Sequence, residues 1–181
     1  MNLRRGLSMV EIMVAAVVIT MTVGPLLGLL SSSNRISNGS LYEEMAVHYA
    51  REICDQLLSL GQRESEIVND AKIMTGNPSI SLGSILNDAG FQAMLEEHGD
   101  NTKIIPLQTN GTMLPVRFTV SPLNQAFSRR RITANTINSS TNSILKGGNY
   151  LKVKVQVVWK ASLSGNDDLR EVNMAVFLKE N

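Results

Sequence analysis

The sequence predicts an α+β fold in which a long N-terminal helix packs on an antiparallel sheet of three to four strands. Three observations carry this prediction: an uncharged apolar segment near the N-terminus, a helical apolar pattern from 41 to 60, and two alternating apolar–polar runs near the C-terminus. About 150 of the 181 residues follow the apolar segment, which is enough for one domain with its own core.

The apolar segment is long enough to cross a membrane. Residues 12–30 contain no charged side chain, and 19 residues of helix at about 1.5 Å each span about 29 Å, close to the thickness of a bilayer core. A secretory signal peptide would be shorter and would end in small residues of the Ala-x-Ala type. Arg4 and Arg5 precede the segment and favour a cytoplasmic N-terminus. We therefore expect residues 7–30 to form a single-pass membrane helix.

One carboxylate, Glu11, lies at the start of this apolar segment. By insertion scales, a charged side chain at the centre of a membrane helix costs about 2.5–3.5 kcal/mol, so such a residue usually has a function. A plain membrane anchor does not need this carboxylate. The alternative is that Glu11 snorkels to the interface, because it lies near the end of the helix.

The residues before and around Glu11 resemble a known export signal. Positions 4–11 have the sequence RRGLSMVE and are followed by apolar residues, a pattern similar to the class III signal of type IV pilins and pseudopilins. The resemblance implies that a prepilin peptidase removes the leader 1–6 by cutting between Gly6 and Leu7, and that the new N-terminus on Leu7 is methylated. Glu11 would then be the fifth residue of the mature chain. Leu7 stands where the family usually has phenylalanine.

The same resemblance implies that Glu11 acts in assembly. Cleavage creates an α-amino group on Leu7 that is cationic near neutral pH. In two axially staggered chains, this cation and Glu11 of the other chain could pair in a low-dielectric setting, which would offset the desolvation cost of both groups. The implied partners are the prepilin peptidase and methyltransferase, other pilins or pseudopilins, and an inner-membrane assembly platform.

A helix break is expected at Gly24 and Pro25. Proline removes one helical hydrogen bond and crowds the preceding turn, which predicts a kink or local unwinding at residues 21–25. The resemblance implies that such a break matters during assembly. The alternative is that Gly24 and Pro25 have no special role, because Gly and Pro are common in transmembrane helices.

Residues 31–61 are predicted to continue the helix as an amphipathic segment. Residues 31–40 are polar and include Asn38-Gly39, so we expect the helix to loosen there. Ser40 and Glu43 have the spacing of a capping box, which predicts a restart, and Gly61 predicts the end. The apolar stripe comprises Leu41, Met45, Tyr49, Ile53, Leu57 and Leu60, with Ala46, Ala50, Cys54 and Leu58 beside them.

Residues 62–181 are predicted to form the globular domain. A short helix is expected at 88–98 and a strand at 116–120, whereas the polar stretch 133–143 predicts an exposed loop. Two alternating runs separated by a polar turn predict a C-terminal β-hairpin at about 150–179. The rest of 62–114 shows no clear period.

Composition and spacing argue against an enzyme or a metalloprotein. His48 and His98 have no second ligand at zinc spacing, and the acidic pair Asp167-Asp168 offers too few oxygens for calcium. No nucleophile elbow, phosphate loop or dinucleotide motif is present in the sequence. We therefore expect no catalytic residues, no metal and no cofactor. The single cysteine, Cys54, cannot form an internal disulfide and is expected in the core.

Net charge gives no support for a nucleic-acid partner. The chain carries +1, and removal of Arg4 and Arg5 leaves 15 basic against 16 acidic side chains. Nucleic acid is therefore not the expected partner, although the composition leaves it open. The run Arg129–Arg131 could contact DNA, anionic lipid or a neighbouring subunit, or it could be a solvated surface.

The resemblance extends, less specifically, to the C-terminal strands, whose valine alternation and Trp159 are similar to minor pilins of the type IV pilus modification family. It implies a minor pilin of a bacterial type IV pilus, inserted in the inner membrane with a cytoplasmic N-terminus and a periplasmic domain, and then incorporated into or priming a filament. A minor pseudopilin of a type II secretion system is the alternative within the family. A single-pass anchored periplasmic sensor or binding module is the alternative from another class.

Overall fold

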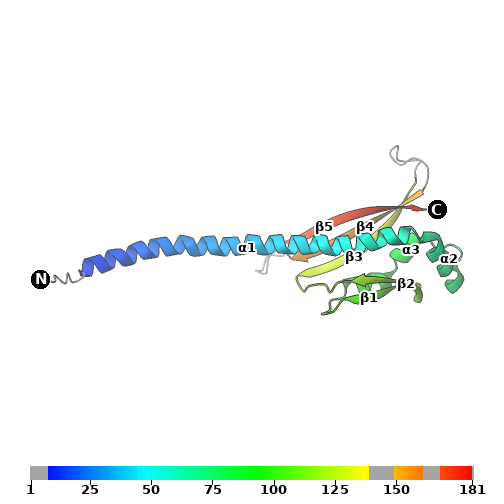
Figure 1. Cartoon of the computed structure of the whole chain (residues 1–181), viewed down its shortest axis with the longest axis horizontal. Helices are drawn as coiled ribbons and strands as arrows, with labels where there is room; N and C mark the ends of the chain where they lie inside the picture. The colour runs from blue at the N-terminus through cyan, green and yellow to red at the C-terminus, as the bar shows by residue number, and fades with distance from the viewer. Residues whose placement is uncertain (1–7, 139–148, 161–167, 181) are drawn as a thin grey trace. The chain divides into compact units, whose positions relative to one another are not determined.

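The computed structural model describes residues 8–138, 149–160 and 168–180 of the chain. It divides into two compact units, Met1–Leu41 and Tyr42–Asn181. The first contains the N-terminal part of helix α1, and the second contains the rest of α1 together with the other helices and strands of the described residues (Figure 1). The fold class is α+β, as predicted, with helix packed against antiparallel sheet.

Helix α1 runs from Met9 to Gly61 without interruption and contains Pro25 in its interior. The loosening expected at residues 31–40 and the restart at Ser40 are therefore wrong, and no unwinding occurs at Gly24 and Pro25 in this structure. Each added residue of an existing helix gains a hydrogen bond, whereas a break leaves several backbone groups unpaired at two new ends. The helix ends at Gly61, as expected. Whether Gly24 and Pro25 act during assembly stays a prediction.

Three short helices follow α1: α2 (Glu64–Thr75), α3 (Leu82–Leu86) and α4 (Ala89–Glu96). Helix α3 begins with a capping box between Ser81 and Ser84. Helix α4 begins with Asp88, whose carboxylate accepts hydrogen bonds from the backbone N–H groups of Gly90 and Phe91 at 3.0 and 3.1 Å. The helix expected at 88–98 is therefore α4, although it ends before Gly99.

The five described strands form two antiparallel sheets, the expected one of three strands and a second one of two strands. Strands β1 (Lys103–Thr109) and β2 (Thr112–Val120) make one hairpin, and β3 (Phe127–Asn138), β4 (Asn149–Lys160) and β5 (Leu169–Glu180) make the other sheet in that order. The loop expected at 133–143 is wrong for residues 133–138, which belong to β3; residues 139–143 lie outside the described chain. The C-terminal hairpin corresponds to β4 and β5, which pair from residue 149 to residue 180.

The side chains of Gln56 in α1 and of Asn87, which caps the C-terminal end of α3, bond to the sheet edges inside the domain. On β2, the Gln56 side chain donates to the Thr119 carbonyl at 2.7 Å and accepts from the Thr119 N–H at 2.8 Å. On β3, the Asn87 side chain makes the same pair of bonds with Ala134, at 2.9 and 3.0 Å. These amides replace the missing neighbouring strand, so both edges are closed to further pairing there.

One hydrophobic core joins the α1 segment after Leu41 to the three short helices and both sheets. Its aromatic centre is Phe127, whose ring lies edge-on to Tyr49 at 5.2 Å and tilted against Trp159 at 6.1 Å between centroids. The predicted stripe is buried at Ala46, Tyr49, Ala50, Ile53, Cys54, Leu57 and Leu60. Leu41 and Leu58 are exposed instead, because a helix buries only the stripe that faces the sheets.

Candidate functional site

The first candidate site is the N-terminal turn of α1, which carries Glu11. The backbone N–H groups of Glu11 and Ile12 both donate to the Ser8 carbonyl, at 2.9 and 3.2 Å, and so start the helix. Glu11 is the acidic residue of this first turn, where the partial positive charge of the helix N-terminus favours a carboxylate. No other charged side chain occurs until Arg35. Gly6 and Leu7, the expected cleavage site, lie outside the described residues.

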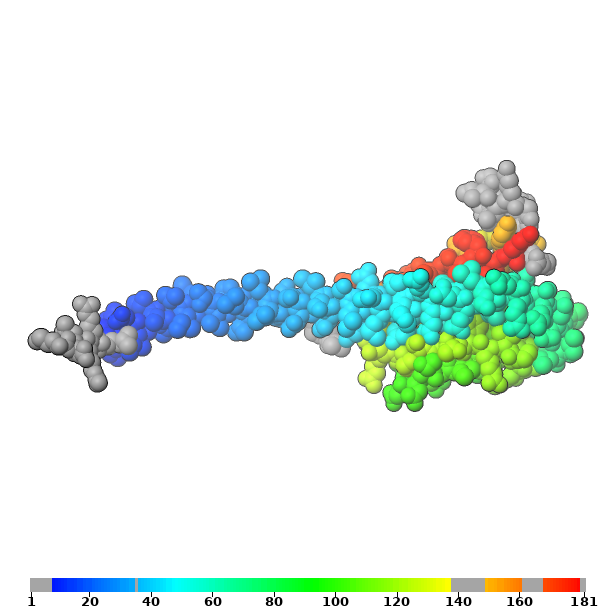
Figure 2. Space-filling model, viewed as in Figure 1, coloured from blue at the N-terminus to red at the C-terminus, as the bar shows by residue number. Residues whose placement is uncertain are grey.

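The helix surface after Glu11 is apolar and uncovered (Figure 2). Its large apolar side chains from Met9 to Leu30 each expose between 44% and 80% of their surface. The hydroxyls of Thr20 and Thr22 donate to backbone carbonyls one turn earlier, at 2.9–3.1 Å, so they leave no unsatisfied polar group on this surface. This segment is the one candidate membrane span among the described residues, long and apolar enough to cross a bilayer.

Two glycines give this helix a place for close approach that the sequence analysis missed. Gly24 and Gly28 are four residues apart and therefore share a face of α1. A Cβ built on either glycine meets nothing within 4 Å, so packing within the chain does not require glycine at these positions. The G-x-x-x-G spacing is typical of helices that approach each other closely in an apolar medium. This spacing is visible in the sequence, where Gly24 beside Pro25 also predicts a helix break.

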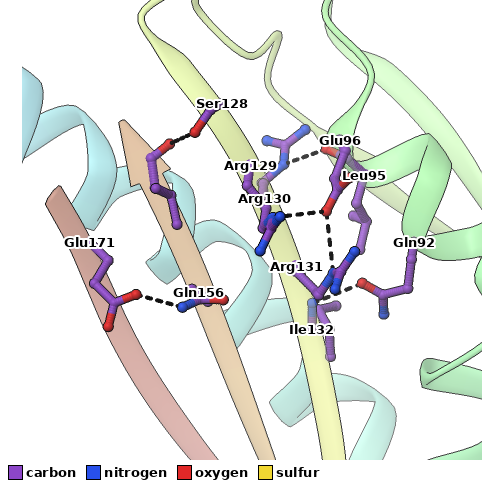
Figure 3. A network of polar contacts seen from close by, with 11 residues as sticks. Gln92, Leu95, Glu96, Ser128, Arg129, Arg130, Arg131, Ile132, Gln156 and Glu171 are labelled. Carbon is purple, nitrogen blue, oxygen red and sulfur yellow. Dashed lines mark hydrogen bonds and ion pairs between the residues drawn. The ribbon is translucent and has the colours of Figure 1, made fainter. Parts of the chain in front are cut away.

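The second candidate site is the arginine run on β3, which the structure divides between two environments (Figure 3). Arg129 and Arg131 lie on the exposed side of the strand and share the carboxylate of Glu96, with N–O distances of 3.8 and 3.3 Å. Arg130 points the other way and is 1% exposed. The expectation of a solvated or partner-binding run is therefore wrong for Arg130, because alternate residues of a strand face opposite sides of the sheet.

Arg130 is held by groups from three other segments of the domain. Its Nε donates to the Leu95 carbonyl and its Nη1 to the Ser121 carbonyl, both at 3.0 Å. Its guanidinium lies over the Tyr49 ring, 5.6 Å from the centroid. Burial lowers the pKa of Arg130, and attraction to the Glu52 carboxylate and to Tyr49 opposes that shift.

Glu52 completes this arrangement from α1. Its Oε1 accepts from the N–H and the hydroxyl of Ser121 at 2.9 and 3.1 Å. Its Oε2 is buried without a hydrogen-bond partner among the described residues. Arg130 therefore places a positive charge that attracts the partly buried Glu52 carboxylate, and it joins α1, α4 and the residues after β2 in a structural role.

The remaining reactive side chains form no site in the described part of the chain. Cys54 is buried, and desolvation with a smaller contribution from Asp55 raises its pKa, which keeps the thiol protonated. The Nε2 atom of His98 lies 2.8 Å from the Phe127 carbonyl oxygen. Among the described residues, no three His, Cys, Asp or Glu side chains gather where they could hold a metal ion. Asp167 lies outside the described residues, and Asp168 is exposed.

Comparison of the chain with protein-family models, with curated proteins and with solved structures finds no match. The functional evidence is therefore the N-terminal sequence pattern and the geometry described above.

Proposed function

We propose that the chain is a non-enzymatic subunit of a bacterial pilus-like filament, within that class a minor pilin of a type IV pilus. The observation that carries the proposal is the single carboxylate, Glu11, at the start of an exposed apolar helix and five residues after Gly6. A membrane anchor alone has no use for that carboxylate or for a glycine between the basic pair and the apolar segment.

The assembly step rests on a pair of charges in two copies of the helix. Removal of residues 1–6 leaves an α-amino group on Leu7, four residues before Glu11. At the helical rise of about 1.5 Å per residue, that separation would correspond to about 6 Å. A copy displaced axially by about that distance places its Glu11 beside this amine. The pairing favours one stagger over others, because any other stagger leaves both charges in an apolar environment.

Van der Waals packing of the apolar helix surface against neighbouring helices supplies the remaining association energy. In the membrane this surface contacts lipid, and in a filament it contacts neighbouring helices, so transfer from one to the other keeps it out of water. Gly24 and Gly28 allow neighbouring helices to approach closely on one face. The proposal places the N-terminus in the cytoplasm and the domain in the periplasm before assembly, as Arg4 and Arg5 favour.

Replacement of the glycine at the proposed cleavage site tests this function. We expect Gly6→Val to retain residues 1–6 and to be absent from sheared filaments, because a Cβ at this position obstructs the close approach that backbone cleavage requires. Processing is measured by the gel mobility of the chain in its native host, and incorporation by immunoblot of the sheared fraction.

The matched control is Gly39→Ala, where an added Cβ meets nothing within 4 Å. This variant should be processed and incorporated like the wild type. If the wild type and Gly6→Val both retained residues 1–6 and neither occurred in the sheared fraction, the chain would be an anchored sensor or binding module and not a filament subunit. Normal processing and incorporation of Gly6→Val would contradict cleavage after Gly6. A neighbouring gene for a retraction ATPase would indicate a pilus, and a secretin with secreted hydrolases would indicate the pseudopilin alternative.

A further inference from the structure

The outer face of the β3-β4-β5 sheet carries an arrangement that the proposed function does not use. Along β4, odd-numbered residues from Leu151 to Trp159 are buried in the core, so the even-numbered side chains lie on the outer face. Strand pairing then places Tyr150 opposite Lys179, and Lys152 opposite Phe177. Directly paired residues share a face of the sheet.

These four residues, Tyr150, Lys152, Phe177 and Lys179, form a checkerboard of two aromatic rings and two ammonium groups that we name the platform. Phe177 is 49% exposed, which is high for a phenylalanine of a sheet, and Tyr150 is half-buried. Strand β5, coloured red, is visible at the molecular surface in Figure 2. Among the described residues, the one cation positioned over an aromatic ring is Arg130, so the platform rings carry no stacked cation of their own.

Positive charge is concentrated at the platform end of the sheet. Lys154 follows on β4, and β3 contributes Thr133 and Asn135 opposite Lys154 and Lys152. The described strand segments 133–137, 150–154 and 175–179 contain no Asp or Glu. The net charge of the whole chain is only +1. The local excess of lysines on this face is therefore visible only when the strands are placed side by side.

The carboxylates of the outer face are held at its other end. Glu171 accepts hydrogen bonds from Asn173 at 2.7 Å and from Gln156 at 2.6 Å, and these bonds lower its pKa. Glu96 is engaged by Arg129 and Arg131. Glu171 also attracts Lys154, so part of the charge of that lysine is offset. Among the described residues, no ion pair or hydrogen bond joins either carboxylate to Lys152 or Lys179, the two lysines of the platform.

We propose that the platform binds single-stranded nucleic acid. Exposed rings offer stacking surfaces for unpaired bases, the lysines attract phosphates, and Asn135 and Thr133 offer hydrogen bonds to base or sugar edges. In a duplex the base faces are covered by stacking, so the rings would have nothing to contact. This binding goes beyond the filament role and does not depend on it, because it requires only the folded domain.

The test is fluorescence anisotropy of a labelled oligothymidylate of about 12 nucleotides, titrated with the full chain in neutral detergent. We expect Phe177→Ala and the conservative Phe177→Leu to bind roughly 5- to 150-fold more weakly, because stacking on an aromatic ring is lost. We expect the double variant Lys152→Gln/Lys179→Gln, which removes both lysines of the platform, to lower the slope of log affinity against log salt by about 1.4. Unchanged Trp159 fluorescence would verify that each variant is folded.

The charge-matched control is Lys72→Gln/Lys103→Gln, on α2 and β1, which should bind like the wild type. Three results would overturn the proposal: no binding by the wild type, equal binding by platform and control variants, or equal competition by heparin or duplex DNA together with an unaffected Phe177→Leu. The last result would indicate a general polyanion surface. Normal binding by the Gly6→Val variant would separate this site from the filament function.

Discussion

Arg130→Met is expected to destabilise the domain by about 2–6 kcal/mol, because each of two buried carbonyls left without its partner costs about 1–3 kcal/mol. The guanidinium is 1% exposed and satisfies the carbonyls of Leu95 and Ser121. Methionine fills similar volume but leaves both carbonyls unpaired and removes the charge that balances Glu52. Three separate segments would lose their common partner at once.

The measurement is urea unfolding of the full chain in neutral detergent, followed by the fluorescence of Trp159. This is the only tryptophan in the sequence, and it is 2% exposed, so its emission reports on the core of the domain. The matched controls are Arg129→Met and Arg131→Met, whose side chains are about half exposed and share one carboxylate. Each control should change stability by no more than about 1 kcal/mol.

A double-mutant cycle with Glu52→Gln separates charge balance from packing. If Arg130 stabilises the domain partly by balancing Glu52, the combined variant should lose less stability than the sum of the two single losses. Simple additivity, or an Arg130→Met variant as stable as the wild type, would contradict a charge-balancing role for Arg130.

Glu11→Gln is expected to lower the amount of chain in sheared filaments at least tenfold while the leader is still removed. A broken charge pair in an apolar environment costs about 3–5 kcal/mol, which exceeds the 1.4 kcal/mol that corresponds to a factor of ten. Glutamine keeps the size and hydrogen-bonding ability of the side chain, so only the charge is removed. The filament fraction and the membrane fraction are compared by quantitative immunoblot.

The control on the same helix is Glu43→Gln, an exposed carboxylate in the domain half of α1. It should leave incorporation unchanged. Equal incorporation of Glu11→Gln and wild type would contradict the proposed pairing of Glu11 with a neighbouring N-terminus. It would favour the interpretation that this carboxylate snorkels to the membrane surface.

The sequence was sufficient for elements with an unbroken period. The stripe of α1 and the alternation of β4 are local patterns, and burial at Tyr49, Ile53 and Leu57 follows the first of them. The continuity of α1 was not predicted, because the polar residues 31–40 weaken the local helical preference. These residues nevertheless do not end the helix. Helix propagation prevailed over that local preference.

Strands β1 and β3 were missed for different physical reasons. In β1 the pairing register shifts between Pro106 and Gln108, so the alternation of apolar and polar residues fails there. The Asn110-Gly111 turn after it, with φ values of 50° and 78°, is a hairpin signal that could have identified β1 and β2 together. In β3 the polar edge is stabilised by Asn87 and Gln92, which are distant in sequence and give no local signal.

The candidate sites were predictable to different degrees. Glu11 stands out in the sequence because it is a charge in an apolar segment, and this needs no tertiary information. The burial of Arg130 and the platform around Phe177 depend on strand registers that join residues about 25 apart or more, so no local pattern could reveal them.

The most direct test of the filament function is the intact mass of the chain extracted from the membranes of its native host. A filament subunit processed at the expected site gives a species that lacks residues 1–6 and carries one added methyl group on Leu7. A full-length, unmodified N-terminus in cells with an active prepilin peptidase would contradict the proposal and leave an anchored domain with another purpose.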